Sequence, residues 1–97
     1  MKRIKDIKEV RSLKPDQRLI RFSRGNIDYY KFLCVHPHNS KYVILMNSCE
    51  EPERFYYSTI IDYFATDYTE QDIISYRIEV YNNLIQKLKQ KLSELEQ

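Results

Sequence analysis

The chain has 97 residues but only one glycine, one alanine and no tryptophan. The single glycine, Gly25, excludes the glycine-rich phosphate-binding loops of nucleotide enzymes, because both the Gly-x-Gly-x-x-Gly pattern and the P-loop need several glycines. Isoleucine, lysine and tyrosine are abundant instead, with eleven, nine and nine copies. This bias indicates an A+T-rich coding sequence and is typical of small proteins of phages and mobile elements, so we expect an origin of that kind.

Long apolar stretches are also missing. The longest runs, YVILM and TIIDYF, fall far short of the roughly 20 residues that span a bilayer. The opening segment, MKRIKDIKEV, lacks the hydrophobic region of a signal peptide. We therefore expect a cytoplasmic protein without a membrane contact, whose two cysteines are reduced thiols.

The net charge of +2 hides an uneven distribution. Residues 1–24 carry nine basic and three acidic side chains, whereas residues 50–72 carry one basic and seven acidic side chains. This asymmetry could create a basic face for nucleic acid. We favour the simpler interpretation, in which the two segments lie against each other or against a neighbouring subunit.

The first two thirds of the chain has β character. Residues 3–13 space their apolar side chains as in a short amphipathic helix. The segments QRLIRFS, IDYYKFLCV, KYVILMN and RFYYSTII are rich in β-branched and aromatic residues and predict about four strands. SRGN, with Gly25 at a position that tolerates positive φ, and HPHNS predict hairpin turns. We expect a small antiparallel sheet or an SH3-like barrel.

The last third predicts a single long helix. Thr69 and Asp72 resemble a capping box, and neither proline nor glycine follows them before Gln97. Such a helix has up to about 29 residues and a length of roughly 43 Å. The predicted fold class is therefore α+β, with a β-rich domain and N-terminal helical arm over residues 1–68 and a coiled-coil-like helix over residues 69–97.

The apolar residues of this helix recur at spacings of four and three, which is the heptad pattern of a coiled coil. We call these seven residues the seam: Ile74, Ile78, Tyr81, Ile85, Leu88, Leu92 and Leu95. A second apolar row, Ile73, Val80 and Leu84, is typical of a helix that lies on its own domain. Only the narrow seam continues beyond Leu88, so we expect self-association or a helical protein partner. A helix packed wholly on its own domain, with a frayed end, is the alternative. Parallel pairing would place Lys91 near Glu96 of the other helix.

Zinc ligands of the right chemical type occur as Cys34, His36, His38 and Cys49. Their spacing lacks the paired units of structural zinc sites, and Cys34, in line with Tyr30 and Phe32, is predicted to be a small core residue. The same four side chains are the only candidates for nucleophilic catalysis, without an oxyanion-hole motif beside them. We assign no catalytic residue, metal, cofactor or small-molecule substrate, and we expect a non-enzymatic protein.

Nucleic-acid binding is the alternative function. Aromatic side chains beside basic ones bind single strands, each stacked base contributing about 1–3 kcal/mol. The candidate contacts on the predicted sheet are Arg18, Arg21, Arg24, Tyr29, Lys31 and Lys41. Adjacent tyrosines, however, send one ring inward and one outward on any two-faced sheet. The favoured function is an assembly or adaptor protein that acts through its C-terminal helix.

Overall fold

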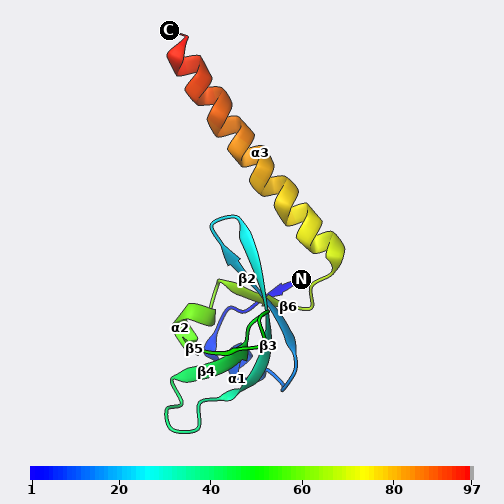
Figure 1. Cartoon of the computed structure of the whole chain (residues 1–97), viewed down its shortest axis with the longest axis vertical. Coiled ribbons are helices and arrows are strands. Elements are labelled where there is room, and N and C mark those ends of the chain that lie inside the picture. Colours follow the sequence, from blue (N-terminus) through cyan, green and yellow to red (C-terminus); the bar gives the residue numbers. More distant parts are fainter. Residues whose placement is uncertain (97) are drawn as a thin grey trace.

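The computed structural model describes residues 1–96 of the chain. All its strands belong to one antiparallel sheet in the order β1-β6-β2-β3-β4-β5, from which a long helix projects (Figure 1). The α+β class and the long C-terminal helix are therefore confirmed. The elements are β1 (Lys2–Arg3), α1 (Ile7–Arg11), β2 (Arg18–Ser23), β3 (Asn26–Val35), β4 (Tyr42–Met46), β5 (Pro52–Tyr56), α2 (Tyr57–Ile60), β6 (Phe64–Thr66) and α3 (Glu70–Leu95).

The number of strands differs from the prediction of about four. The sheet has six strands, and within residues 1–96 β1 and β5 remain its two edges, so an SH3-like barrel is not confirmed. The additional strands β1 and β6 have two and three residues, which is too short for an alternating pattern to emerge. The predicted strand RFYYSTII is split, because the chain turns into α2 after Tyr56.

Both predicted hairpin turns are present. Between β2 and β3, Arg24 and Gly25 have φ values of 51° and 84°, the positive angles that a two-residue hairpin favours. Between β3 and β4, the Nδ1 atom of His36 accepts hydrogen bonds from the backbone N–H groups of His38 and Asn39, each at 3.1 Å. His36 thus has a structural role at this turn.

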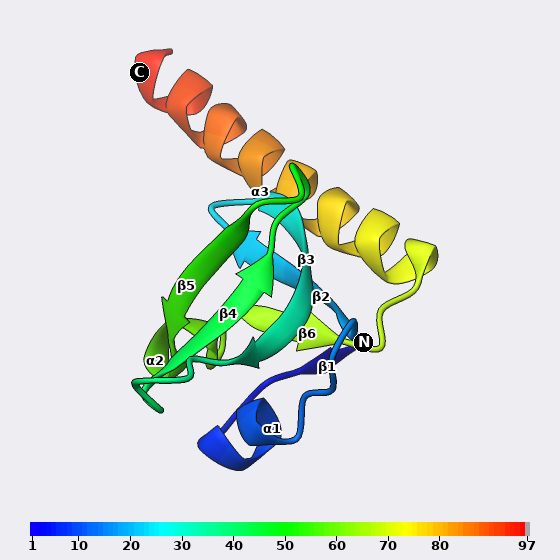
Figure 2. The same cartoon turned by 60° about the horizontal axis from the view of Figure 1, so that its bottom comes forward.

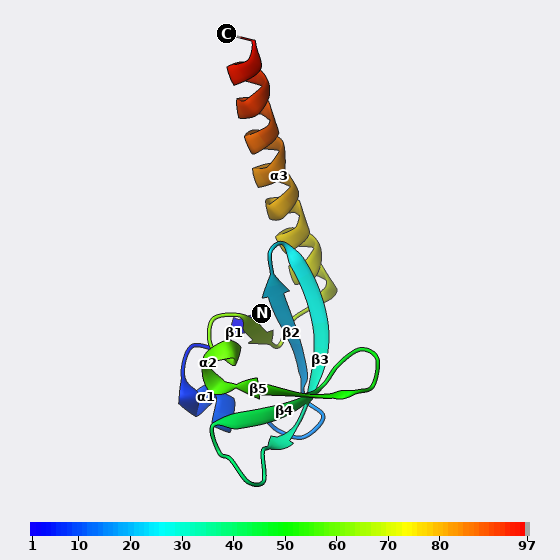
Figure 3. The same cartoon turned by 60° about the vertical axis from the view of Figure 1, so that its left-hand side comes forward.

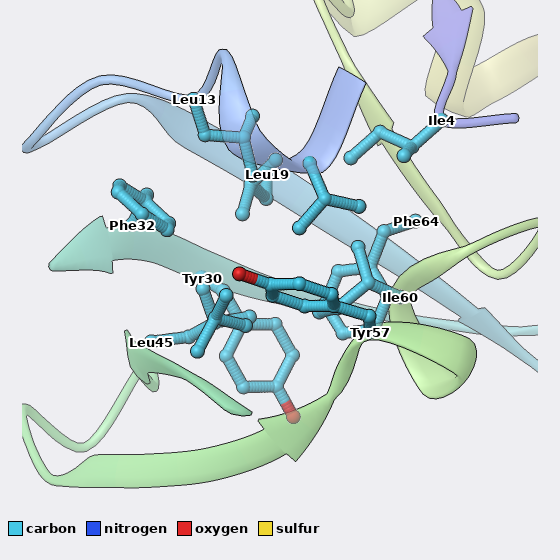
Figure 4. Close-up of a cluster of buried hydrophobic side chains, with 11 residues drawn as sticks. Ile4, Leu13, Leu19, Tyr30, Phe32, Leu45, Tyr57, Ile60 and Phe64 are labelled. Atoms are coloured by element: carbon cyan, nitrogen blue, oxygen red, sulfur yellow. The ribbon is translucent and has the colours of Figure 1, made fainter. Parts of the chain in front are cut away.

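The larger hydrophobic core lies on one face of the sheet, where α1 and α2 cover it (Figure 4). Helix α1 is shorter than predicted, because Lys2 and Arg3 pair with β6 and Asp6 caps the helix, accepting from the Glu9 N–H at 2.9 Å. Ile7, which was predicted to lie on the apolar face of this helix, is exposed. The buried residues of this core are Ile4, Val10, Leu13, Leu19, Tyr30, Phe32, Val43, Leu45, Tyr57, Ile60 and Phe64.

A smaller core occupies the other face, since Leu19 and Ile20 are neighbours on β2 and point to opposite sides of the sheet. Here the first turns of α3 cover the sheet, as Figure 2 shows. The ring of Tyr76 meets that of Phe22 edge-on at 4.6 Å. The buried residues of this smaller core are Ile20, Phe22, Ala65 and Ile73. The N-terminal half of α3 is thereby anchored to the β domain.

The basic and acidic segments identified in the sequence meet in this fold. Strand β1 pairs with β6, and the Lys5 ammonium lies 3.9 Å from the Asp62 carboxylate. The Met1 amino group lies 3.2 Å from Asp72. Part of the positive charge of residues 1–24 is therefore balanced within the chain.

Candidate functional site

Helix α3 begins with a complete capping box. The Thr69 hydroxyl accepts from the Asp72 N–H at 3.2 Å, and the Asp72 carboxylate accepts from the Thr69 N–H at 2.9 Å. The hydrogen bond from the Thr69 backbone, followed by the Met1 amino group, lowers the pKa of Asp72. The start of the helix is thus fixed at Thr69.

One row of α3 faces the sheet. Ile73 is buried, Tyr76 and Val80 are half-buried, and a Cβ placed on Gly25 would meet a Val80 methyl at 2.9 Å. The predicted second row extended one residue too far, because Leu84 is 52% exposed. Val80 of α3 lies against Gly25 at the tip of the β2–β3 hairpin, whereas Leu84, one turn further along the helix, is left exposed.

The seam residues form a different row on the same helix. All seven are substantially exposed, from 48% for Ile85 to 84% for Leu95. At 100° per residue, the seam lies about 120° around the helix from the row that faces the sheet. Figures 1 and 3 show the C-terminal half of α3 extending away from every other element. The seam is therefore an apolar surface that the folded chain itself leaves uncovered. Within residues 1–96, none of the helices has the length and apolarity needed to cross a membrane.

A pocket of about 450 Å³ lies beside the start of α3. Its floor comes from β2, β3 and β4, one wall is the loop after β4, and Tyr68, in the segment between β6 and α3, closes another side. Two of its lining residues are basic, three are tyrosines, and the others are a methionine, an asparagine, a serine and a glutamate. The full lining is Arg18, Lys31, Tyr29, Tyr30, Tyr68, Met46, Asn47, Ser48 and Glu50.

The loop wall of this pocket is held by its own hydrogen bonds. The Oδ1 atom of Asn47 accepts from the backbone N–H groups of Cys49 and Glu51, each at 2.9 Å. Glu50, which also lines the pocket, adopts a φ of 61°. A loop with this internal network presents a defined wall rather than an open rim.

Two of the tyrosine rings of the pocket, those of Tyr29 and Tyr68, stand 6.2 Å apart at an angle of 55°. Tyr29 is 41% exposed, whereas Tyr68 also packs against the smaller core. Burial raises the pKa of Tyr68, and the neighbouring Arg18 guanidinium acts in the opposite direction. Arg18 is thus close enough to Tyr68 to interact with it electrostatically.

The predicted nucleic-acid contacts do not form one patch. Arg18 and Lys31 are direct cross-strand partners, and Tyr29 lies on the same sheet face, so these three line the pocket together. Arg21 points to the other face, with its guanidinium 5.8 Å from the Phe55 ring centre. Arg24 lies in the β2–β3 turn, and Lys41 lies just before β4, at the other end from the pocket. Tyr68 and Asn47 were missed, because only the fold brings these loop residues to the strands.

The zinc candidates do not gather into one site, although the rings of His36 and His38 lie 6.1 Å apart at the β3–β4 turn. Within residues 1–96, no three His, Cys, Asp or Glu side chains are grouped as a metal site requires. Cys34 and Cys49 are both exposed free thiols, so the prediction that Cys34 is a core residue is wrong. A β-bulge between Phe32 and Cys34 shifts the register, and Cys34 pairs with Ile44 instead of continuing the buried face of Phe32.

Comparison with protein-family models, with curated proteins and with solved structures found no match to this chain. The features of the molecule from which a function can be inferred are the seam, the pocket and the chemistry of their side chains.

Proposed function

We propose that this chain is a non-enzymatic assembly protein that associates with a second copy of itself through the seam of α3. The observation that supports the proposal best is the exposure of all seven seam residues in a helix whose other apolar row is already used by the sheet. A 3.5-residue apolar repeat is self-complementary, because two such helices can supercoil with their repeats in register. A phage or mobile-element origin fits the composition.

The exposed apolar area is large enough to stabilise a dimer. Full burial of one such side chain contributes about 1.5–3 kcal/mol, and about half of each seam residue remains to be buried. Two helices therefore contribute roughly 10–20 kcal/mol, against association costs of about 4–15 kcal/mol. This comparison favours a dimer whose population depends on protein concentration.

The charges beside the seam favour parallel pairing. In a parallel pair, Lys91 lies near Glu96 of the partner helix, which is an attraction. An antiparallel pair that stacks Ile78 on Leu88 would bring Arg77 of each helix near Lys91 of the other helix. Both contacts are between like charges and are therefore repulsive. The β domains of a parallel dimer also stay clear of the contact, because each lies about 120° around its helix from the seam.

Sedimentation velocity on seam variants tests the proposal. The wild-type chain should sediment as a dimer of 11.9 kDa subunits at about 100 µM, and Leu88→Asp with Leu92→Asp should give a folded monomer. The matched control is Gln86→Asp with Gln90→Asp, which adds the same charge to the same turns on the opposite side of the helix and should leave the dimer intact. Equal effects of the two pairs of substitutions would contradict a seam interface.

Cysteine cross-linking tests the orientation separately. Leu95→Cys, in a chain that also carries Cys34→Ser and Cys49→Ser, should form a disulfide dimer under mild oxidation, because parallel helices bring the two Leu95 positions together. An antiparallel dimer would hold these positions at opposite ends of the seam. A wild-type mass of two subunits without cross-linking would therefore refute the parallel arrangement but not self-association.

A further inference from the structure

We propose that the pocket beside α3 binds a nucleotide unit, with the base against the Tyr29 ring and the phosphate between Arg18 and Lys31. This is a second binding activity, independent of the seam, and its expected ligand is single-stranded nucleic acid or a free nucleotide. The shared chemistry of these ligands is a planar ring joined to a phosphate. The sequence alone could not place this chemistry in a pocket.

The two cations of the pocket are available to a ligand. The ion pairs among residues 1–96 join Met1 to Asp72 and Lys5 to Asp62, so neither Arg18 nor Lys31 is neutralised by a carboxylate in the described part of the chain. Other arginines stack on rings of the protein itself: Arg3, Arg11, Arg21 and Arg54. Glu50 adds one negative charge at the wall, and the lining is left with a net positive charge.

The shape and the remaining side chains of the pocket fit a base. A volume of about 450 Å³ falls in the usual range of small-ligand sites, about 300–1,000 Å³. The angled rings of Tyr29 and Tyr68, with Met46 beside them, provide an apolar surface for a planar group. Stacking on an aromatic ring tolerates any base, and the Oδ1 atom of Asn47 already accepts from the backbone of its own loop. We therefore expect weak preference among bases.

Fluorescence anisotropy with a labelled oligothymidylate of about eight nucleotides tests the proposal at about 50 mM salt. Two phosphate contacts predict a slope of about −1.4 for log K against log salt, so a change to about 200 mM salt should weaken binding about sevenfold. Tyr29→Ala should weaken binding about tenfold through loss of stacking, whereas Tyr29→Phe should retain the wild-type affinity. Because Tyr29 lies at the surface, these variants should keep their circular dichroism spectrum.

Charge variants locate the site. Arg18→Gln with Lys31→Gln should remove most of the affinity, and the matched control, Arg24→Gln with Lys41→Gln, should leave it unchanged although it removes the same charge. Competition by thymidine monophosphate identifies a free-nucleotide site, and binding of the oligonucleotide without such competition identifies a single-strand site. No binding of either probe, equal losses in the two charge pairs, or tighter binding of an acidic peptide would overturn the proposal. The experiment is repeated in the Leu88→Asp, Leu92→Asp chain, in which the pocket should still bind.

Discussion

Substitution of Gly25 by alanine tests how α3 is held against the sheet. Gly25 has a φ of +84°, and a Cβ there would lie 2.9 Å from the Cγ1 atom of Val80. The positive φ costs an alanine about 1–2 kcal/mol, and overpacking against Val80 adds about 1–3 kcal/mol. We therefore expect Gly25→Ala to lower the free energy of unfolding by about 2–5 kcal/mol.

Urea denaturation followed by circular dichroism measures this loss. The Leu88→Asp, Leu92→Asp background removes any contribution from subunit association. In a chain that also carries Val80→Ala, the overpacking disappears while the backbone strain remains, so Gly25→Ala should then cost only about 1–2 kcal/mol. Gly25→Asn is the complementary control, because asparagine tolerates positive φ but keeps the Cβ. An identical cost of Gly25→Ala with and without Val80→Ala would show that the helix does not approach the turn.

Three further predictions concern the helix cap, the helix contact and the bulge. Because the folded-state pKa of Asp72 is lowered, the carboxylate stabilises the fold above its ordinary pKa of about 4, and this stabilisation is lost as the pH falls through the folded-state pKa. In urea titrations at several pH values, the difference in unfolding free energy between wild type and Asp72→Asn should therefore shrink below about pH 4. A difference that grows in acid would contradict this linkage. In the Leu88→Asp, Leu92→Asp background, Ile73→Ala should lower the free energy of unfolding by about 2–4 kcal/mol and Leu84→Ala by less than about 0.5 kcal/mol. Similar losses for the two substitutions would place Leu84 against the sheet. Cys34 and Cys49 should both react with a thiol reagent in the native state, and protection of Cys34 would contradict the bulge.

Features set by neighbouring residues could be predicted from the sequence. Thr69 and Asp72 mark the start of α3, since capping depends on residues three apart. Gly25 marks the β2–β3 turn for the same reason, because a two-residue hairpin needs positive φ at its centre. The seam is likewise a periodic pattern within one helix, so its members share one exposed side of α3.

Features that depend on contacts between distant segments could not be predicted. The short strands β1 and β6 exist because residues 2–3 and 64–66 complete the sheet edge together. The bulge before Cys34 has no signature in the alternating pattern and reverses the face on which that side chain lies. The pocket likewise combines Arg18 and Lys31 with Tyr68, which lies 50 and 37 positions further along the sequence and reaches them because β6 pairs with β2.

Light scattering across a concentration series measures the central claim, self-association through the seam, most directly. The mean mass should rise from 11.9 kDa in dilute solution toward twice that value at about 100 µM, and Leu88→Asp with Leu92→Asp should abolish the rise. A mass of 11.9 kDa at every concentration of the wild-type chain would contradict the proposed assembly.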